Sequence, residues 1–364
     1  MILSLTCDLV KANPIPSVEL PRIHINSDGT IEPSTVPILQ TGNVYTFTGN
    51  IKNYSIEVHR NDIILDGAGY MLQSEVYNID GGSASKGVSL YTRSNVTIQN
   101  LEIQHFHEAI RVYDSSNIQI VKNTVTNNDH GVYMLYSSNI SVEQNHLTKN
   151  RIGILFGACN HISITENLFT KNMIGINADS NPASSFQINI IRNDIIENQE
   201  TGMASAGTGI VVSGGLDVFI IANNIENNIR GVYLSYTNCT VYHNAFVDNA
   251  EQFYGLYSQV DPVNQRSISW DNGTQGNYWS NYKGKDENND GIGDTPHIIQ
   301  KTTTQNEPTT NVPITHGVDA QDNFPLMEPS TIPEFPSWTV LLVFMVTATF
   351  VAIFKKRGYS LSAT

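Results

Sequence analysis

The chain has 364 residues, only 15% of them charged, and a formal net charge of −14. An acidic chain without a Lys/Arg cluster in its body lacks the basic face that phosphate contacts need, so we expect no nucleic-acid partner. Abundant Asn, Ser, Thr and Gly disfavour long amphipathic helices and favour short strands joined by tight turns.

The N-terminal end precedes the repeated part of the chain. Residues 1–12 (MILSLTCDLVKA) are apolar and end in a small residue, but they have no basic start. Residues 1–20 are therefore either a leader remnant, the stump of a signal peptide, or a disordered tail. Residues 21–54 are predicted to form N-terminal cap strands.

A repeat of about 22 residues, a period typical of solenoid proteins, occupies residues 55–260. Segments that begin at Asn95, Asn117, Asn139 and His161 align at this spacing. A small residue recurs at Gly87, Ala109, Gly131, Gly153, Gly175 and Gly231. One Asn column comprises Asn123, Asn145, Asn167, Asn193, Asn223 and Asn244, and a second comprises Asn128, Asn150, Asn172, Asn198, Asn228 and Asn249. Later spacings lengthen, and the Gly-rich stretch 201–216 is predicted to be an inserted loop.

Apolar residues alternate between these columns, which is the period of a strand with one buried face. Three short strands are expected in each coil, and stacked coils would share one core. The Asn columns are assigned to ladders at bends, where an amide can bond to its copy in the next coil and Asn tolerates left-handed backbone. The registers of leucine-rich and helical repeats are absent. The predicted fold is all-β, a right-handed parallel β-helix.

One bend of the repeat carries the nearest approach to a catalytic site. Glu108 and His130 stand at equivalent positions of adjacent coils, and a Glu–His pair can serve as general acid and base. Arg111 and Asp129 complete the candidate catalytic set. The outward column through Arg111 holds no pair of acids, whereas polysaccharide hydrolysis needs two. We therefore favour the competing interpretation, an ordinary ion pair at a solvated bend.

Two other residue patterns in the repeat suggest ligand binding. His105-Phe106-His107 would place two imidazoles on one strand face, which could bind copper or zinc, but a third ligand is lacking. Tyrosines recur near one coil edge, and their rings suit sugar binding, with shielding of the coil bends as the alternative. The candidate ligand-binding residues are Tyr133, Tyr136, Tyr233 and Tyr236.

Residues 261–327 are predicted to form a C-terminal cap that contains an Asp/Asn-rich loop. Oxygen-bearing side chains and one main-chain carbonyl follow the ligand order of a calcium loop, at Asp286, Asn288, Asp290, Ile292 and Asp294. Gly291 stands where such a loop turns sharply, but His297 replaces the bidentate Glu of an EF-hand. The alternatives are a Ca²⁺ site similar to thrombospondin type 3 or dockerin half-loops and a simple acidic turn.

The C-terminal end carries a predicted membrane anchor. A Pro-rich linker, 328–337, precedes 17 uncharged residues, 338–354, which are long enough to span a bilayer as a helix. Residues 355–364 begin with Lys-Lys-Arg and would be the cytoplasmic tail. The body would then lie on the extracellular face. Pro333-Glu334-Phe335-Pro336 resembles the sorting signal of archaeal surface proteins, which implies an archaeosortase-like enzyme as a partner.

The repeats resemble the CASH class of carbohydrate-binding proteins and sugar hydrolases, and especially its NosD-like branch. The resemblance covers residues 55–327. It includes the first-coil motif at 61–70 and the C-terminal motifs at 276–282 and 322–326. It implies a right-handed β-helix, and for the best-known member a role in maturing a copper site. The chain shows no thiolate or Met cluster, so copper is not the expected cofactor.

These features favour a cell-surface β-helix that binds carbohydrate or cell-envelope material. A polysaccharide lyase, hydrolase or epimerase is the first alternative, because such enzymes share the fold class. NosD-like copper-site maturation and a structural surface-layer component are the others. An acid–base pair on one outward stripe would favour the enzyme, whereas a stripe lined by Tyr would favour binding.

Overall fold

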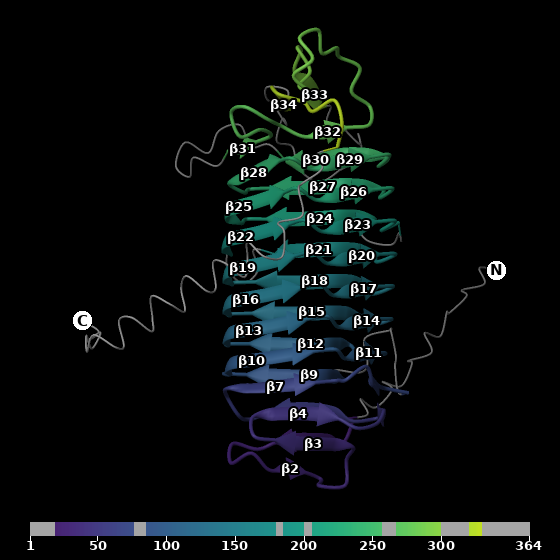
Figure 1. Ribbon diagram of the computed structural model, residues 1–364, viewed down its shortest axis with the longest axis vertical. Coiled ribbons are helices and arrows are strands. Elements are labelled where there is room, and N and C mark those ends of the chain that lie inside the picture. The colour runs from purple at the N-terminus through teal and green to yellow at the C-terminus, as the bar shows by residue number, and fades with distance from the viewer. Residues whose placement is uncertain are drawn as a thin grey trace, which may run out of the picture. The chain divides into compact units, whose positions relative to one another are not determined.

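The computed structural model describes residues 19–75, 85–179, 185–199, 206–256, 267–299 and 320–329. The described residues form strands and turns without a helix, within one compact unit that ends at Pro329. The strands stack as successive coils, each passing through three parallel sheets (Figure 1). This confirms the predicted parallel β-helix of three short strands per coil; its right-handed sense stays a prediction.

Each sheet takes one parallel strand from every coil, and sheets A and B each begin with one antiparallel strand, Ile31–Glu32 and Ile38–Thr41. In order across the sheet, sheet A contains β2 (Ile31–Glu32), β1 (Arg22–Ile25), β6 (Ser55–Val58), β9 (Lys86–Tyr91), β12 (Glu108–Tyr113), β15 (His130–Leu135), β18 (Ile152–Gly157), β21 (Ile174–Asp179), β24 (Thr208–Ser213), β27 (Arg230–Ser235) and β30 (Glu251–Leu256). Sheet B contains β3 (Ile38–Thr41), β4 (Val44–Phe47), β7 (Ile63–Asp66), β10 (Ser94–Gln99), β13 (Ser116–Val121), β16 (Ser138–Glu143), β19 (Asn160–Thr165), β22 (Phe186–Ile191), β25 (Leu216–Ile221), β28 (Cys239–Tyr242) and β31 (Ile268–Ser269). Sheet C contains β32 (Tyr278–Trp279), β29 (Ala245–Val247), β26 (Asn224–Glu226), β23 (Asp194–Ile196), β20 (Leu168–Thr170), β17 (His146–Thr148), β14 (Thr124–Thr126), β11 (Glu102–Gln104), β8 (Met71–Gln73) and β5 (Ile51–Lys52).

The register between strands follows the 22-residue repeat. Glu108 lies opposite His130, and His130 lies opposite Ile152. Ile110 and Val112 are fully buried while Arg111 between them faces outward. Strand alternation thus builds one continuous core inside the coils. Small residues line one column because a Cβ on Gly153 would lie 2.5 Å from the carbonyl oxygen of Gly175.

Both Asn columns form buried ladders, as predicted. The main-chain and side-chain N–H groups of Asn145 both donate to the Oδ1 atom of Asn167, at 2.9 and 3.0 Å. The left-handed backbone was assigned to the wrong residues, however. It occurs one position before the ladder, for example at Gln144 and Glu166, so that the Asn amide can turn into the core.

The predicted loop 201–216 is only partly irregular. Residues 208–213 form β24, which pairs in register between β21 and β27, and Gly209 belongs to the small-residue column. The additional residues of this coil therefore fall between β23 and β24 in the sequence. Periodicity was obscured here because the added residues shifted the whole strand out of the 22-residue alignment.

Aromatic side chains close the C-terminal end of the core. Trp279 stacks on Phe246 with 4.4 Å between ring centroids, and Trp270 packs edge-on against Phe253 at 4.9 Å. Beyond them, β33 (His297–Ile299) and β34 (Ala320–Asp322) form a separate antiparallel pair. The motifs at 276–282 and 322–326 meet here, since the main-chain N–H of Gly276 donates to the carbonyl oxygen of Phe324.

The predicted anchor and leader lie largely or wholly outside the described residues. This applies to residues 1–18 and to the segments 338–354 and 355–364. None of the described segments forms a helix long and apolar enough to cross a membrane. The anchor, the sorting motif and the cytoplasmic tail therefore stay predictions.

Candidate functional site on the outer face of sheet A

The outer face of sheet A and the turns at the ends of its strands carry the predicted catalytic and tyrosine residues. Strand pairing places Glu57, Ser89, Arg111 and Tyr133 in one outward column on β6, β9, β12 and β15. Neighbouring rungs of a sheet lie about 4.8 Å apart. Side chains that are one coil apart in the sequence are therefore in contact range along this face.

Arg111 is the centre of this face. Its Nη1 atom donates to both carboxylate oxygens of Glu108, at 2.9 and 2.8 Å. Its guanidinium carbon lies 5.4 Å from the ring centroid of Tyr113 and 5.3 Å from that of Tyr133. A guanidinium in contact with two rings and a carboxylate is fixed in position and largely neutralised.

Tyrosine rings extend this cluster over three coils. Tyr91 stacks on Tyr113 with 5.1 Å between centroids, and Tyr136 meets the edge of Tyr113 at 5.4 Å. Tyr91 is 59% exposed and Tyr136 is 46% exposed. We call Tyr91, Arg111, Tyr113, Tyr133 and Tyr136 the tyrosine platform. Its rings are held by one another and still present faces to solvent.

A network of charged side chains borders the platform. Asp129 accepts a hydrogen bond from Arg151 through Oδ1, and its Oδ2 atom lies 2.7 Å from Nδ1 of His107. Burial would raise the pKa of Asp129, but these hydrogen bonds outweigh it and hold the pKa well below its ordinary value. The hydrogen bond to Asp129 raises the pKa of His107.

His130 is buried at the centre of the same network. Its Nε2 atom lies 3.0 Å from Nη2 of Arg151, and because a guanidinium only donates, Nε2 must be the acceptor. The proton of the neutral ring is then on Nδ1, which is buried without a hydrogen-bond partner. Burial lowers the pKa of His130 to about 4.

The predicted catalytic set is brought together, but its groups are engaged with arginines. Glu108 and His130 are cross-strand neighbours, as the repeat predicted. Glu108 is bonded to Arg111, Asp129 to Arg151, and His130 also to Arg151. An ionised carboxylate and a neutral imidazole, each held by a cation, match the ion-pair interpretation more closely than an acid–base pair. Their catalytic role stays a hypothesis.

The predicted tyrosine set separates into two groups. Tyr133 and Tyr233 lie in the same outward column, but they are four rungs apart, about 19 Å at the usual strand spacing. Tyr136 and Tyr236 lie instead in the turns after β15 and β27. Between the groups, Ile152, Ile174 and Val211 form a buried apolar cluster.

A second, smaller aromatic group surrounds Arg230. Tyr233 stacks on Tyr254 with 5.4 Å between centroids, and the guanidinium of Arg230 lies 4.9 Å from the Tyr254 centroid. Arg230 also pairs with Glu251 at 3.0 Å. The combination of one Arg, one Glu and stacked Tyr rings therefore occurs twice on this face.

The His105-Phe106-His107 prediction was wrong about its geometry. These residues form the turn between β11 and β12, with Phe106 in the core. His105 has left-handed backbone and lies 3.3 Å from the side-chain amide of Gln73, whereas His107 faces Asp129. The short sequence spacing suggested a shared strand face because the turn at His105 was not recognised.

The Asp/Asn-rich loop is folded around its own carboxylates. Asp286 accepts hydrogen bonds from the main-chain N–H groups of Asp290 and Gly291, at 3.2 and 2.8 Å. Asp294 accepts from the N–H of Glu287 at 2.7 Å. Gly291 has φ +84°, as the predicted sharp turn requires. In this conformation the three Asp side chains are not among the described groups whose ligand atoms lie within 4.8 Å of one another. Calcium binding stays a prediction.

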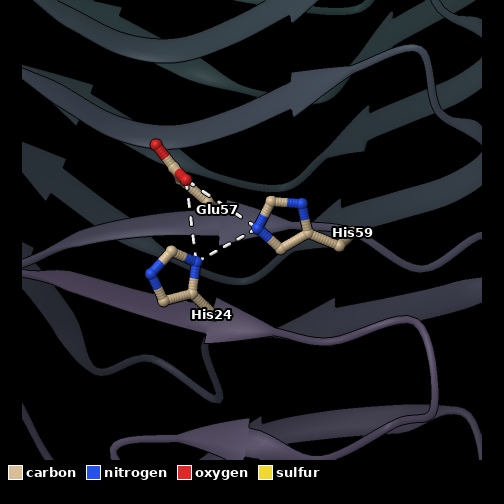
Figure 2. A group of neighbouring side chains, drawn as sticks. All are labelled: His24, Glu57 and His59. Carbon is tan, nitrogen blue, oxygen red and sulfur yellow. Dashed lines mark hydrogen bonds and ion pairs between the residues drawn. The ribbon is translucent and has the colours of Figure 1, made fainter.

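Two clusters in the described part of the chain do bring three potential metal ligands within 4.8 Å of one another. The first is His107, Asp129 and His130, and the second is His24, Glu57 and His59 (Figure 2). Sequence reasoning missed the second cluster. His24 lies before the repeated part of the chain, so only the pairing of β1 with β6 brings it to Glu57.

The fold and its outer face define a parallel β-helix protein with a polar and aromatic stripe on one sheet. A family model described as periplasmic copper-binding protein (NosD) matches residues 28–284. The chain belongs to the NosD family, which confirms the resemblance found in its repeats.

Curated relatives match part of the chain. It is 34% identical over 106 residues to a probable ABC transporter binding protein NosD of Stutzerimonas stutzeri, covering 27% of this chain and 23% of that protein. The corresponding protein of Pseudomonas aeruginosa is 31% identical over 105 residues, covering 27% and 24%. The matched region is thus about a quarter of the length of these relatives.

Solved structures with similar coils include the periplasmic alginate epimerase AlgG, with a TM-score of 0.46 and 12% identity over 73% of this chain and 79% of that one. Another is the tailspike protein 2 of bacteriophage CBA120, with a TM-score of 0.45 and 11% identity over 73% and 41%. At these levels the similarities carry no argument about what this chain does.

The family description raises the question of which residues would fit a copper ion. In the His107 cluster, Arg151 donates to both Asp129 and His130. The positively charged guanidinium already bonds to the atoms that would coordinate the ion and would repel it, so the cluster does not fit a metal cation. In the His24 cluster, two imidazole nitrogens and one carboxylate oxygen face one another without an intervening cation, and these residues fit.

Proposed function

We propose that this chain binds carbohydrate through the tyrosine platform on the outer face of sheet A. The observation that carries the proposal is Arg111 fixed between the rings of Tyr113 and Tyr133 by the carboxylate of Glu108. Aromatic rings offer an apolar face to the C–H groups of a sugar, and their hydroxyls can bond to its hydroxyl groups.

The charges of the site favour a neutral glycan. Glu108 neutralises Arg111, and the whole chain carries a net charge of −14. A polyanionic ligand would approach a protein of its own sign and would find the guanidinium of Arg111 already paired with Glu108. Neutral polysaccharides are therefore the ligand class that the platform supports best.

The proposal includes a location outside the cytoplasmic membrane. The family description as periplasmic supports it, and the uncharged segment 338–354 supports attachment to a membrane with 355–364 on the cytoplasmic side. Recognition of Pro333-Glu334-Phe335-Pro336 by an archaeosortase-like enzyme belongs to the same proposal. Cell fractionation of the wild type and of a chain truncated after residue 329 tests it. Equal distribution of the two would contradict membrane attachment.

The test of glycan binding is retention on a panel of immobilised neutral and acidic polysaccharides. We expect Tyr133→Ala to weaken binding by about tenfold, the magnitude of one aromatic contact. Tyr233→Ala probes the Arg230 group in the same way. Tyr70→Ala is the matched control, because Tyr70 is 38% exposed but lies before β8 in sheet C, away from sheet A. Unchanged retention of the Tyr133 and Tyr233 variants would refute the proposal.

The same panel separates the alternative functions. New reducing ends or unsaturated uronates would show a hydrolase or lyase, and their loss in Glu108→Gln and His130→Gln would identify the acid–base pair. If the chain neither binds a polysaccharide nor forms a product, a structural role at the surface is favoured. Retention without products is the result that we expect.

A further inference from the structure

The first rungs of the outer face of sheet A carry a cluster that glycan binding does not use. His24 lies on β1 between the buried Ile23 and Ile25, so alternation turns its side chain outward. Glu57 lies directly opposite it on β6, and His59 follows the end of that strand. Figure 2 shows the three side chains converging on the same point.

The spacing of the three donor atoms matches a metal ion. Nδ1 of His24 and Nε2 of His59 are 3.1 Å apart, and Oε2 of Glu57 lies 3.6 and 3.8 Å from them. An ion at the centre of the circle through these three atoms would lie about 2.0 Å from each of them. This is the usual length of a metal bond to imidazole nitrogen or carboxylate oxygen.

The two imidazoles face each other with their nitrogens. Their ring centroids are 5.3 Å apart, so the 3.1 Å nitrogen–nitrogen contact lies almost on the line between them. One nitrogen carries a proton and donates it to the other, and a bound metal ion would replace this proton. A bound ion would sit off this line toward Glu57, so each ring must turn. Both side chains have room, with 33% and 47% of their surfaces exposed.

The second oxygen of Glu57 is held by a separate partner. Nε of Arg22 lies 3.3 Å from Oε1, and another nitrogen of Arg22 pairs with Glu19. Arg22 therefore orients the carboxylate and leaves Oε2 directed at the two histidines. This differs from the His107 cluster, where Arg151 bonds to Asp129 and His130 themselves.

We propose that His24, Glu57 and His59 bind a divalent transition-metal ion, with Cu²⁺ bound more tightly than Zn²⁺. Imidazole nitrogens are donors of intermediate softness that suit these ions, whereas Ca²⁺ and Mg²⁺ require a shell of oxygen ligands that one carboxylate cannot supply. The order follows the general affinity series of first-row divalent metals. The family description names copper; the residues that hold the ion are our assignment.

The position of the cluster gives the ion two properties. His24 and Glu57 belong to different strands, so the ion would link β1 to β6 at the N-terminal end of the stack. Three protein ligands on an open strand face leave at least one coordination position for water or an incoming donor. The site is therefore suited to an ion that exchanges with a partner or with solution.

Isothermal titration of the full-length chain with CuCl₂ and ZnCl₂, in a buffer with a weak competing ligand, tests the proposal. We expect one equivalent of Cu²⁺ to bind, with two nitrogen donors visible in its electron paramagnetic resonance spectrum. His24→Ala and His59→Ala should each weaken binding by about 100-fold or more, since loss of residues that merely orient ligands already costs about 10–100-fold. Glu57→Gln removes the charge of the third ligand but keeps an oxygen donor, and should weaken binding by at least about tenfold.

Two control variants make the assignment specific. His107→Ala alters the other cluster, and His146→Ala removes an exposed strand histidine on sheet C. Both should bind Cu²⁺ as the wild type does. His24 lies within β1, so His24→Ala could perturb the pairing of β1 with β6. His59 lies after the end of β6, so His59→Ala tests the site without that effect. Wild-type affinity in both the His24 and His59 variants, or loss of binding in His107→Ala alone, would overturn the proposal, as would the absence of tight Cu²⁺ binding to the wild type.

Discussion

The main-chain N–H of Asn277 donates to the buried carboxylate of Asp322 at 2.7 Å, and this bond ends the first Asn ladder. The preceding bond of the ladder runs from the main-chain N–H of Asn244 to the Oδ1 atom of Asn277, at 3.1 Å. The ladder therefore has a defined last acceptor, supplied by a strand 45 residues away in the sequence. A stack of open-ended hydrogen bonds is closed by one carboxylate.

Replacement of Asp322 by Ala should loosen the C-terminal cap. The carboxylate also accepts the indole N–H of Trp279 at 2.9 Å and the N–H of Phe324 at 3.1 Å. Each buried donor left without an acceptor costs about 1–3 kcal/mol. Burial raises the pKa of Asp322, so losing a poorly solvated charge offsets part of this loss. We expect a net loss of about 2–4 kcal/mol.

Urea unfolding followed by tryptophan fluorescence measures this loss, because Trp270 and Trp279 lie in the cap. Asp194→Ala is the control, since Asp194 is an exposed residue at the start of β23. It should leave the transition unchanged. If Asp322→Ala unfolds at the wild-type urea concentration, the carboxylate does not stabilise the end of the ladder.

Replacement of Asn167 by Ala should destabilise the middle of the stack. Its amide donates to the carbonyl oxygen of Val142 at 2.8 Å and accepts two bonds from Asn145. All of these groups are buried, and we expect a loss of about 2–4 kcal/mol. Asn189→Ala, on the partly exposed face of sheet B, should cost less than about 0.5 kcal/mol. Equal thermal midpoints for the two variants would argue against an energetic role for the ladder.

The stability of the chain should fall as the pH decreases from about 6.5 to about 4. His130 is buried and its pKa is lowered to about 4, whereas the unfolded chain takes up this proton near 6.5. Protonation in this window therefore favours the unfolded state, by at most about 3 kcal/mol at 1.36 kcal/mol per pH unit.

Thermal denaturation at several pH values checks this dependence. His130→Gln should flatten the slope between pH 4 and 6.5, while His146→Gln should keep it. His107 acts in a different window: its pKa is raised by Asp129, so its stabilisation is present below pH 6.5 and is lost as the pH rises through the raised value. An identical acid slope in wild type and His130→Gln would contradict the assignment.

Calcium should bind to the loop that contains Asp286, Asp290 and Asp294 if the predicted ligand order is functional. The main-chain N–H groups would keep their hydrogen bonds to the carboxylates of Asp286 and Asp290. The remaining lone pairs of the carboxylate oxygens would coordinate the calcium ion. Calorimetric titration of wild type against Asp290→Ala measures this, with Asp194→Ala as the control. Equal heats in wild type and Asp290→Ala would end the hypothesis.

Most of the coil architecture could be predicted from the sequence. Glu108 and His130 were placed together by counting one repeat along the chain, and their strands pair in that register. Arg111, which holds Glu108, belonged to the predicted set, whereas Arg151, which holds His130, was not predicted. Arg151 reaches back to both Asp129 and His130 in the preceding coil, and these contacts depend on its side-chain conformation, which the repeat does not encode.

Two kinds of feature were missed: a residue displaced by an insertion, and the position of left-handed backbone in the turns. Gly209 belongs to the small-residue column but follows an insertion, so alignment assigned it to a loop. The positive-φ position was shifted by one residue, because Gln144 and Glu166 are not residue types that indicate left-handed backbone. The left-handed backbone at these turns is imposed by the stacking of the coils and not by the preference of the residue that adopts it.

The sequence by itself determined which residues are stacked on one another inside the repeat. In a parallel β-helix a fixed spacing in the sequence becomes a fixed distance of about 4.8 Å between rungs, so periodicity alone gives the neighbours. The tertiary structure decided the contacts at the two ends, where the period fails. His24 meets Glu57 at the first rungs and Asn277 meets Asp322 at the last, and no repeat encodes either pairing.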